Sequence, residues 1–209
     1  EELLAVIEHL RQTDGKRFST RALETGRHFY GGEPRGSWAP ASLIEGKDVL
    51  VIGAGPSALR HKQALEDYIE VLRPIVVALN AQVTVREALV DIRAASHPVR
   101  LLADWATHLT LPQPLATPAS MLPTSVRDLL KDKKILDFGL AIQADTFRFS
   151  EHHCVLPTSL VIGYALAIAA SGRASRVLLA GFDGYGADDP RTAEVDKLFS
   201  GYQSTAGTP

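Results

Sequence analysis

The stretch DVLVIGAGPS, residues 48–57, decides the fold class of this chain. After its aspartate it is an unbroken apolar run, which is typical of a strand buried on both faces of a parallel sheet. Two closely spaced glycines follow, and they let the backbone turn tightly. Residues 57–72 have a helical pattern, and residues 74–79 (PIVVAL) form a second apolar run. A strand, a glycine turn, a helix and a strand in this order predict a right-handed parallel crossover.

The same alternation continues along the chain. We expect further helices over residues 84–95, 157–171 and 191–199, and further strands over residues 99–103, 134–138 and 176–180. Residues 111–123 are rich in proline, which predicts a loop. The predicted fold class is therefore α/β, with a doubly wound, mainly parallel, Rossmann-like sheet.

Residues 1–46 have a different pattern from the rest of the chain. An amphipathic helix is predicted at its start, and the glycines and prolines after it predict an irregular linker that packs through Phe29, Tyr30 and Trp38. We interpret residues 1–46 as a connector helix and linker from an upstream domain, and residues 47–209 as one Rossmann-like domain. On this interpretation, both ends of the sequence are cut from a longer polypeptide.

Composition narrows the classes of partner. The chain has 22 Lys and Arg against 24 Asp and Glu, which gives no basic surface for a nucleic acid or an anionic membrane. Its most apolar run, residues 157–170, is shorter than the roughly 20 residues that a membrane span needs. The single cysteine, Cys154, excludes an internal disulfide and favours a reducing compartment. We therefore expect a cytoplasmic protein without a nucleic-acid partner or a membrane span.

The glycine turn is the first candidate site. Gly53 and Gly55 allow a ligand to approach the backbone, and the helix after them would offer free N–H groups to a phosphate. Ser57 would cap that helix or donate its hydroxyl to the ligand. The pattern fits the dinucleotide-binding fingerprint, but Pro56 removes one N–H, and Asn80 stands where an acidic residue would bind a ribose. We predict a phosphate or nucleotide ligand here; a turn that serves only chain reversal is the alternative.

Two further segments carry candidate residues. Thr158 and Ser159 open the predicted helix of residues 157–171, where they would cap it or help to bind an anion. Asp183 and Tyr185 follow the predicted strand of residues 176–180, at the edge where open α/β sheets bind ligands. They could contact a sugar, a metal-bound phosphate or a base, and Asp183 is the best candidate for a catalytic group.

No cofactor is identified with certainty from the sequence. A nucleotide or nucleotide-sugar ligand and Mg²⁺ both stay open, and no protein-held metal is predicted. The adjacent His152, His153 and Cys154 are poorly spaced for zinc, whose ligands must converge.

Three segments together resemble the bacterial sialyltransferases that modify lipooligosaccharide. They are residues 49–57, 79–80 and 158–185, which match a Gly-x-Gly-Pro-Ser turn, a strand-end Asn, a Thr-Ser helix start and a strand leading into Gly-x-Asp-x-Tyr. Archaeal pterin pyrophosphokinase-like proteins share the first of these. The resemblance implies a pocket for a cytidine nucleotide-sugar, lined by Gly55, Ser57, Asn80, Thr158, Ser159 and Tyr185. The chain departs from the family pattern at Ala54 and Leu160, and it has no histidine after His153 to match the family's catalytic one.

Over residues 18–202 the chain is more similar to the C-terminal domain fused behind aldolase barrels of the pyruvate-lyase-like class. These are relatives of hydroxymethylglutaryl-CoA lyase and 4-hydroxy-2-oxovalerate aldolase in surface-polysaccharide (lipopolysaccharide and O-antigen) biosynthesis. The resemblance implies an upstream barrel in the same polypeptide, which would carry the lyase chemistry, and a nucleotide-binding role for this domain. Two alternatives stay open: a glycosyltransferase-like or pyrophosphokinase-like enzyme in its own right, and a structural module that mediates homo-oligomerisation without a ligand.

Overall fold

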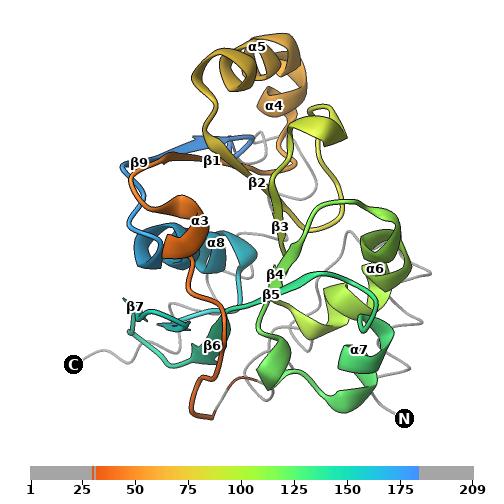
Figure 1. Ribbon diagram of the computed structural model, residues 1–209, viewed down its shortest axis with the longest axis vertical. Helices are drawn as coiled ribbons and strands as arrows, with labels where there is room; N and C mark the ends of the chain where they lie inside the picture. Colours follow the sequence, from red (N-terminus) through yellow and green to blue (C-terminus); the bar gives the residue numbers. More distant parts are fainter. Residues whose placement is uncertain (1–29, 31, 184–209) are drawn as a thin grey trace, which may run out of the picture.

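The computed structural model describes residue 30 and residues 32–183, and its centre is a six-stranded sheet (Figure 1). The strand order is β5-β4-β3-β2-β1-β9, and every neighbouring pair is parallel. The strands are β1 (Asp48–Ile52), β2 (Ile75–Leu79), β3 (Ile92–Ala94), β4 (Leu115–Thr117), β5 (Ile135–Asp137) and β9 (Arg176–Ala180). The predicted α/β fold with a parallel sheet is confirmed.

Helices cover both faces of this sheet. They are α3 (Ala41–Ile44), α4 (Pro56–Arg60), α5 (Lys62–Leu72), α6 (Pro98–Thr110), α7 (Thr124–Leu129) and α8 (Val161–Ser171). In Figure 1, α3 and α8 lie on one side of the sheet, and α6 and α7 lie on the other. The doubly wound arrangement is therefore confirmed. None of the helices in the described part of the chain combines the length and apolarity needed to cross a bilayer.

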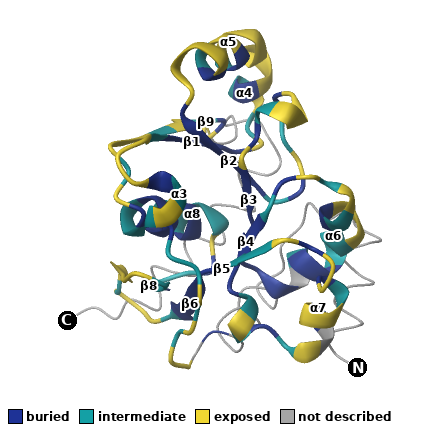
Figure 2. Cartoon of the chain, viewed as in Figure 1, coloured by how far each residue is buried: buried dark blue, intermediate teal, exposed yellow. Residues whose placement is uncertain are grey.

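Strand β1 shows why its sequence is continuously apolar. Val49 and Val51 pack in the core cluster that includes α8, whereas Leu50 and Ile52 pack in a second cluster with Ile69 of α5. Successive side chains of a strand point to opposite faces, so a strand covered on both sides needs apolar residues at every position. Figure 2 shows these buried strands against the largely exposed outer surface of α5.

The chain reverses its direction of travel across the sheet next to β1. Strands β1 to β5 are added one after another on one side, and the chain then returns to place β9 on the other side of β1. The return passes through a small sheet of order β6-β8-β7 and then through α8. Its strands are β6 (Gly139–Ile142), β7 (Arg148–Phe149) and β8 (His153–Leu156). Open α/β sheets bind ligands where the strand order reverses, which here is between β1 and β9.

The described part of the predicted connector packs into the domain core. Tyr30 is fully buried and its hydroxyl donates to the carbonyl of Ser96. Trp38 contacts Phe138 edge-on, with ring centroids 6.5 Å apart, and Ile44 of α3 is fully buried. These residues therefore belong to the same core as the sheet. The helices predicted at the start of the chain and over residues 191–199 lie outside the described residues.

Two predicted elements between β2 and β4 are wrong. Residues 84–95 form a short 3₁₀ helix, η1 (Glu87–Leu89), and strand β3 instead of a helix. Residues 99–103 lie inside α6 instead of forming a strand, because Pro98 occupies the first helical turn, where its missing N–H costs nothing. The three residues of β3 are too few to show strand periodicity, and Arg93 interrupts them.

Further elements lie in segments that carried no strand or helix prediction. The predicted loop of residues 111–123 contains β4 and a second 3₁₀ helix, η2 (Ala119–Met121), and α7 follows it. The small sheet was also not predicted. Each of its strands has only two to four residues, which is too short to show an alternation of apolar and polar residues. These strands depend on pairing with a neighbour, which the local sequence does not reveal.

Candidate ligand site at the carboxyl edge of the sheet

The carboxyl edge of the sheet, where the parallel strands end, brings three of the predicted segments together. Ile52 at the end of β1 aligns with Ala78 of β2 and with Ala180 of β9. The segments that follow these neighbouring strands are therefore adjacent at this edge, at strand spacings of about 4.8 Å. They are the glycine turn (residues 53–57), Asn80 and the β9 loop (residues 181–183). Tyr185 lies outside the described residues.

The glycine turn packs directly on the β9 loop. The Gly55 N–H donates to the carbonyl of Gly181 at 2.9 Å, and the Gly53 N–H donates to that of Ala180 at 2.9 Å. A Cβ atom added to Gly55 would lie 2.5 Å from the Gly181 oxygen, closer than real Cβ atoms approach an oxygen. Gly181 itself has a φ of 76°, which favours glycine. The glycines are therefore required for the close approach of two chain segments.

The sequence predicted that Ser57 could cap the helix, but in the structure it does not. The cap position is Gly55, without a side-chain hydrogen bond, and Pro56 takes the first helical position. Ser57 lies one residue further on, where its N–H donates to Oδ2 of Asp183 at 3.1 Å and its hydroxyl donates to Oδ1. The Asp183 carboxylate therefore caps the start of α4 from a segment 126 residues away in the sequence.

Asp183 is exposed and ionised in this arrangement. The hydrogen bond from the Ser57 hydroxyl is the main cause that lowers the pKa of Asp183 below its ordinary value, and Arg60 adds a smaller favourable charge. The positive end of the α4 backbone dipoles favours the same charged form. At neutral pH this side chain can accept hydrogen bonds or hold a cation, but it is a poor general base.

A cavity of about 370 Å³ opens beside the Ser57–Asp183 pair. Its lining consists of Ser57, Ala58, His61 and Leu65, together with residues 179–183. The volume lies within the range of small-molecule sites, and the lining combines apolar walls with a few polar groups. His61 and Leu65 were missed by the sequence analysis. Because Ser57, His61 and Leu65 recur at four-residue intervals, a helical projection of the predicted helix would have found them.

Asn80 is held firmly at the end of β2. Its φ is 60°, a left-handed conformation that asparagine tolerates better than most residues. The guanidinium of the fully buried Arg93 donates to the carbonyl of Asn80 at 3.0 Å and to that of Ala81 at 2.8 Å. Arg93 also forms an ion pair with Glu87. The rigid turn keeps Asn80 at the carboxyl edge, and no contact between its side chain and Asp183 is observed.

Thr158 and Ser159 lie before α8 and do not cap it. The helix begins at Val161 instead of residue 157, and its cap residue is Leu160, without a side-chain hydrogen bond. The Thr158 hydroxyl instead accepts the N–H of Leu160 at 3.0 Å and closes the preceding turn. The carbonyl of Ser159, which is buried, accepts the hydroxyl of Ser96 at 3.3 Å, just past the end of β3. These residues are therefore near the carboxyl edge beside β3, and not at the Ser57–Asp183 pair.

The His152-His153-Cys154 segment does not form a metal centre in the structure. Cys154 is buried in the core cluster, and burial raises the pKa of its thiol. His153 precedes it in β8 and therefore points to the opposite face of the small sheet. In residue 30 and residues 32–183, no three His, Cys, Asp or Glu side chains are grouped so that they could hold a metal ion.

Comparison of the chain with models of known protein families gives no match, and comparison with curated proteins also gives none.

Proposed function

We propose that this domain binds a nucleotide or nucleotide-sugar in the cavity beside Asp183, which is lined by the start of α4 and by the β9 loop. The observation that supports the proposal is the ionised Asp183 carboxylate beside a cavity of about 370 Å³, at the point where the strand order reverses. An ionised carboxylate accepts hydrogen bonds from hydroxyl groups such as those of a ribose. The walls formed by Leu65, Leu179 and Phe182 suit the flat face of a base or the apolar face of a sugar ring.

The contacts at Ser57 favour hydroxyl recognition over direct phosphate binding. Its N–H and hydroxyl already donate to Asp183, and Pro56 has no N–H to offer. A phosphate group at the start of α4 would have to replace the carboxylate, or share Mg²⁺ with it. We therefore place the ligand hydroxyls on Asp183 and the phosphate further along the carboxyl edge, towards Asn80.

The wider proposal concerns the protein in which this domain acts. Its motifs resemble the domain behind aldolase-like barrels of surface-polysaccharide biosynthesis, so we propose that it holds the nucleotide-linked substrate for such a barrel. A transferase reaction within this domain would need a general base. The lowered pKa of Asp183 makes that residue a weak one, which favours the binding role over the glycosyltransferase-like alternative.

One observation favours the structural role as a second candidate. Among the described residues, strand β9 is the edge strand of the sheet, and its side chains Val177 and Leu179 are 40% and 51% exposed. Apolar side chains on an open edge strand are typical of a surface that pairs with another strand. On this proposal the domain would promote oligomerisation, and light scattering would detect a dimer that Leu179→Lys converts to a monomer.

A thermal-shift titration tests the proposed binding function. The chain is heated with CMP, UMP, CDP or UDP-glucose, with and without Mg²⁺. A ligand at one hundred times its Kd stabilises the fold by about 2.7 kcal/mol. We expect stabilisation by at least one compound, loss of most of it in Asp183→Asn, and no change in the control Asp132→Asn, which alters an exposed aspartate after α7. Absence of stabilisation by all four compounds would exclude the nucleotide site and leave the structural role.

A further inference from the structure

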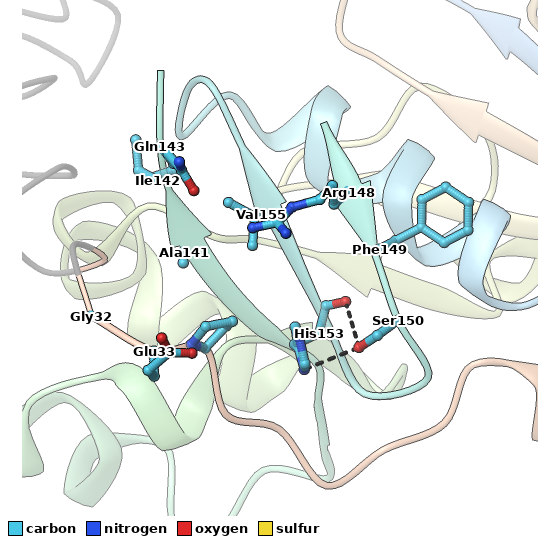
Figure 3. Close-up of a pocket in the computed structure, with 11 residues that line it drawn as sticks. Gly32, Glu33, Ala141, Ile142, Gln143, Arg148, Phe149, Ser150, His153 and Val155 are labelled. Atoms are coloured by element: carbon cyan, nitrogen blue, oxygen red, sulfur yellow. Dashed lines mark hydrogen bonds between the residues drawn. The ribbon is translucent and has the colours of Figure 1, made fainter. Parts of the chain in front are cut away.

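A second cleft, larger than the cavity at Asp183, lies over the face of the small sheet that is turned away from α8 (Figure 3). Its volume is about 510 Å³, and it shares no lining residue with the carboxyl-edge cavity. Strand alternation explains the position of the cleft. Leu140, Cys154 and Leu156 point into the core with α8, so Ala141, His153 and Val155 point to the other face. The segment of residues 32–34 forms the opposite wall.

Arg148 brings an unneutralised positive charge to this cleft. It pairs with Val155 in the β7–β8 ladder, and Figure 3 shows its guanidinium extending over Val155 towards the middle of the sheet. In the part of the chain that the structure describes, no carboxylate or hydrogen-bond acceptor engages this guanidinium. Glu33 lines the same cleft from the opposite wall, and the two charges do not form an ion pair. The cleft therefore has room for a ligand between a cation and an anion.

His153 is oriented by its neighbour Ser150. The Ser150 hydroxyl lies 3.0 Å from Nδ1 of His153 and 3.4 Å from its carbonyl oxygen (Figure 3). The Ser150 N–H also donates to that carbonyl at 2.8 Å, across the β7–β8 turn. When the hydroxyl donates to Nδ1, the ring proton is on Nε2, which is then a donor towards a ligand; when the hydroxyl donates to the His153 carbonyl, Nε2 is an acceptor. The cleft thus combines the donor Arg148, the imidazole of His153 and the acceptor Glu33.

This combination identifies a class of ligand. A guanidinium and an imidazole N–H bind carboxylate or phosphate oxygens, and guanidinium does so in a bidentate manner. The Glu33 carboxylate and the Gln143 amide, which also lines the cleft, are suited to hydroxyl groups. The small apolar side chains of Ala141 and Val155 form a floor that a sugar ring can cover.

We propose that this cleft is a binding site for an acidic sugar, with its anionic group on Arg148 and His153 and its hydroxyls on Glu33 and Gln143. A carboxylate and a phosphate would be bound by the same donors. The site is independent of the nucleotide site, so the domain would hold two different ligands.

Amide chemical-shift mapping with three probes tests this site. The probes are D-glucuronate, which carries a carboxylate, D-glucose 6-phosphate, and neutral D-glucose. We expect at least one of the two anions to shift the amide signals of Ala141 and Val155. D-glucose should bind at least about tenfold more weakly, because it lacks the group that the guanidinium recognises. The anion that binds more tightly identifies the anionic group.

Two variants locate the binding. Arg148→Gln should weaken anion binding at least about tenfold, whereas Arg127→Gln, on α7, should leave it unchanged. Both side chains are exposed, so the fold should be retained, and an unchanged amide spectrum outside the cleft verifies this. The proposal is overturned if neither anion binds, if glucose binds as tightly as they do, or if Arg148→Gln binds normally. Shifts of the Ala141 and Val155 amides report on this cleft, and shifts of the Gly55 and Ser57 amides report on the nucleotide site, so failure of one site would be separate from failure of the other.

Discussion

Buried His108 should make the stability of this domain depend on pH. Its side chain on α6 is 1% exposed, and within the described part of the chain its Nδ1 has no hydrogen-bond partner. Burial lowers the pKa of His108 from 6.5 to about 4, and the nearby positive charges of Arg93, Lys133 and Arg100 act in the same direction. The neutral ring is therefore the form that the folded protein favours.

The sign and size of the effect follow from this pKa. Because the folded pKa is below the unfolded one, the unfolded chain binds more protons between about pH 4 and pH 6.5. The free energy of unfolding should be highest above pH 6.5 and should fall as the pH decreases towards 4. The separation of the two pKa values corresponds to about 3 kcal/mol, a large part of the roughly 5–15 kcal/mol that stabilises a typical domain.

Urea unfolding at several pH values between 7.5 and 4.5 measures this effect. The carboxylates also titrate below pH 5, so the comparison is between the native chain and His108→Gln, which cannot take up the proton. On acidification from pH 7.5 to 4.5, the native chain should lose about 2 kcal/mol or more of unfolding free energy relative to His108→Gln. Parallel pH profiles for the two proteins would show that His108 is not buried in its neutral form.

Three further predictions concern the carboxyl edge. Gly55→Ala should lower the free energy of unfolding in urea by about 1–3 kcal/mol, because its Cβ would lie 2.5 Å from a backbone oxygen. The control Gly32→Ala, whose Cβ would have nothing within 4 Å, should cost much less, and equal costs would contradict the close packing at Gly55. Arg93→Met leaves two carbonyls and a glutamate without their buried partner and should lower the free energy of unfolding by about 3 kcal/mol or more. A loss below about 1 kcal/mol would show that Arg93 does not hold the turn at Asn80 in place. Ser57→Ala removes the main cause of the low Asp183 pKa, which should rise towards its ordinary value in a carboxyl ¹³C NMR titration; an unchanged pKa would show that the pair is not formed.

The parts of the fold that could be predicted are those whose pattern is set by burial on two faces. Strands β1 and β2 are continuous apolar runs between turns, so their ends and the carboxyl edge could be located in advance. Strand β9 could also be located as an apolar run, although Val177 and Leu179 in it are exposed. The segment around β3 could not be predicted. Arg93 is charged but fully buried, and it is accommodated only by acceptors from other segments, including the carbonyls after β2 and the side chain of Gln113. No local pattern contains that information.

The candidate site also has parts that could be predicted from the sequence and parts that could not. The glycine turn and the loop after β9 were recognised separately from local sequence, and the strand order makes them neighbours. The capping of α4 by Asp183 could not be predicted, because it joins residues 126 positions apart and places a carboxylate where a phosphate was expected. Thr158 and Ser159 were expected to open the helix, but α8 begins only at Val161, so they lie in the turn before it.

Amide chemical-shift mapping with CMP is the decisive test of a ligand site at the reversal point between β1 and β9. The largest shifts should fall on Gly55, Ser57 and Asp183, and they should disappear in Asp183→Asn. Shifts confined to other segments, or no shifts at saturating nucleotide, would contradict a nucleotide site at this edge.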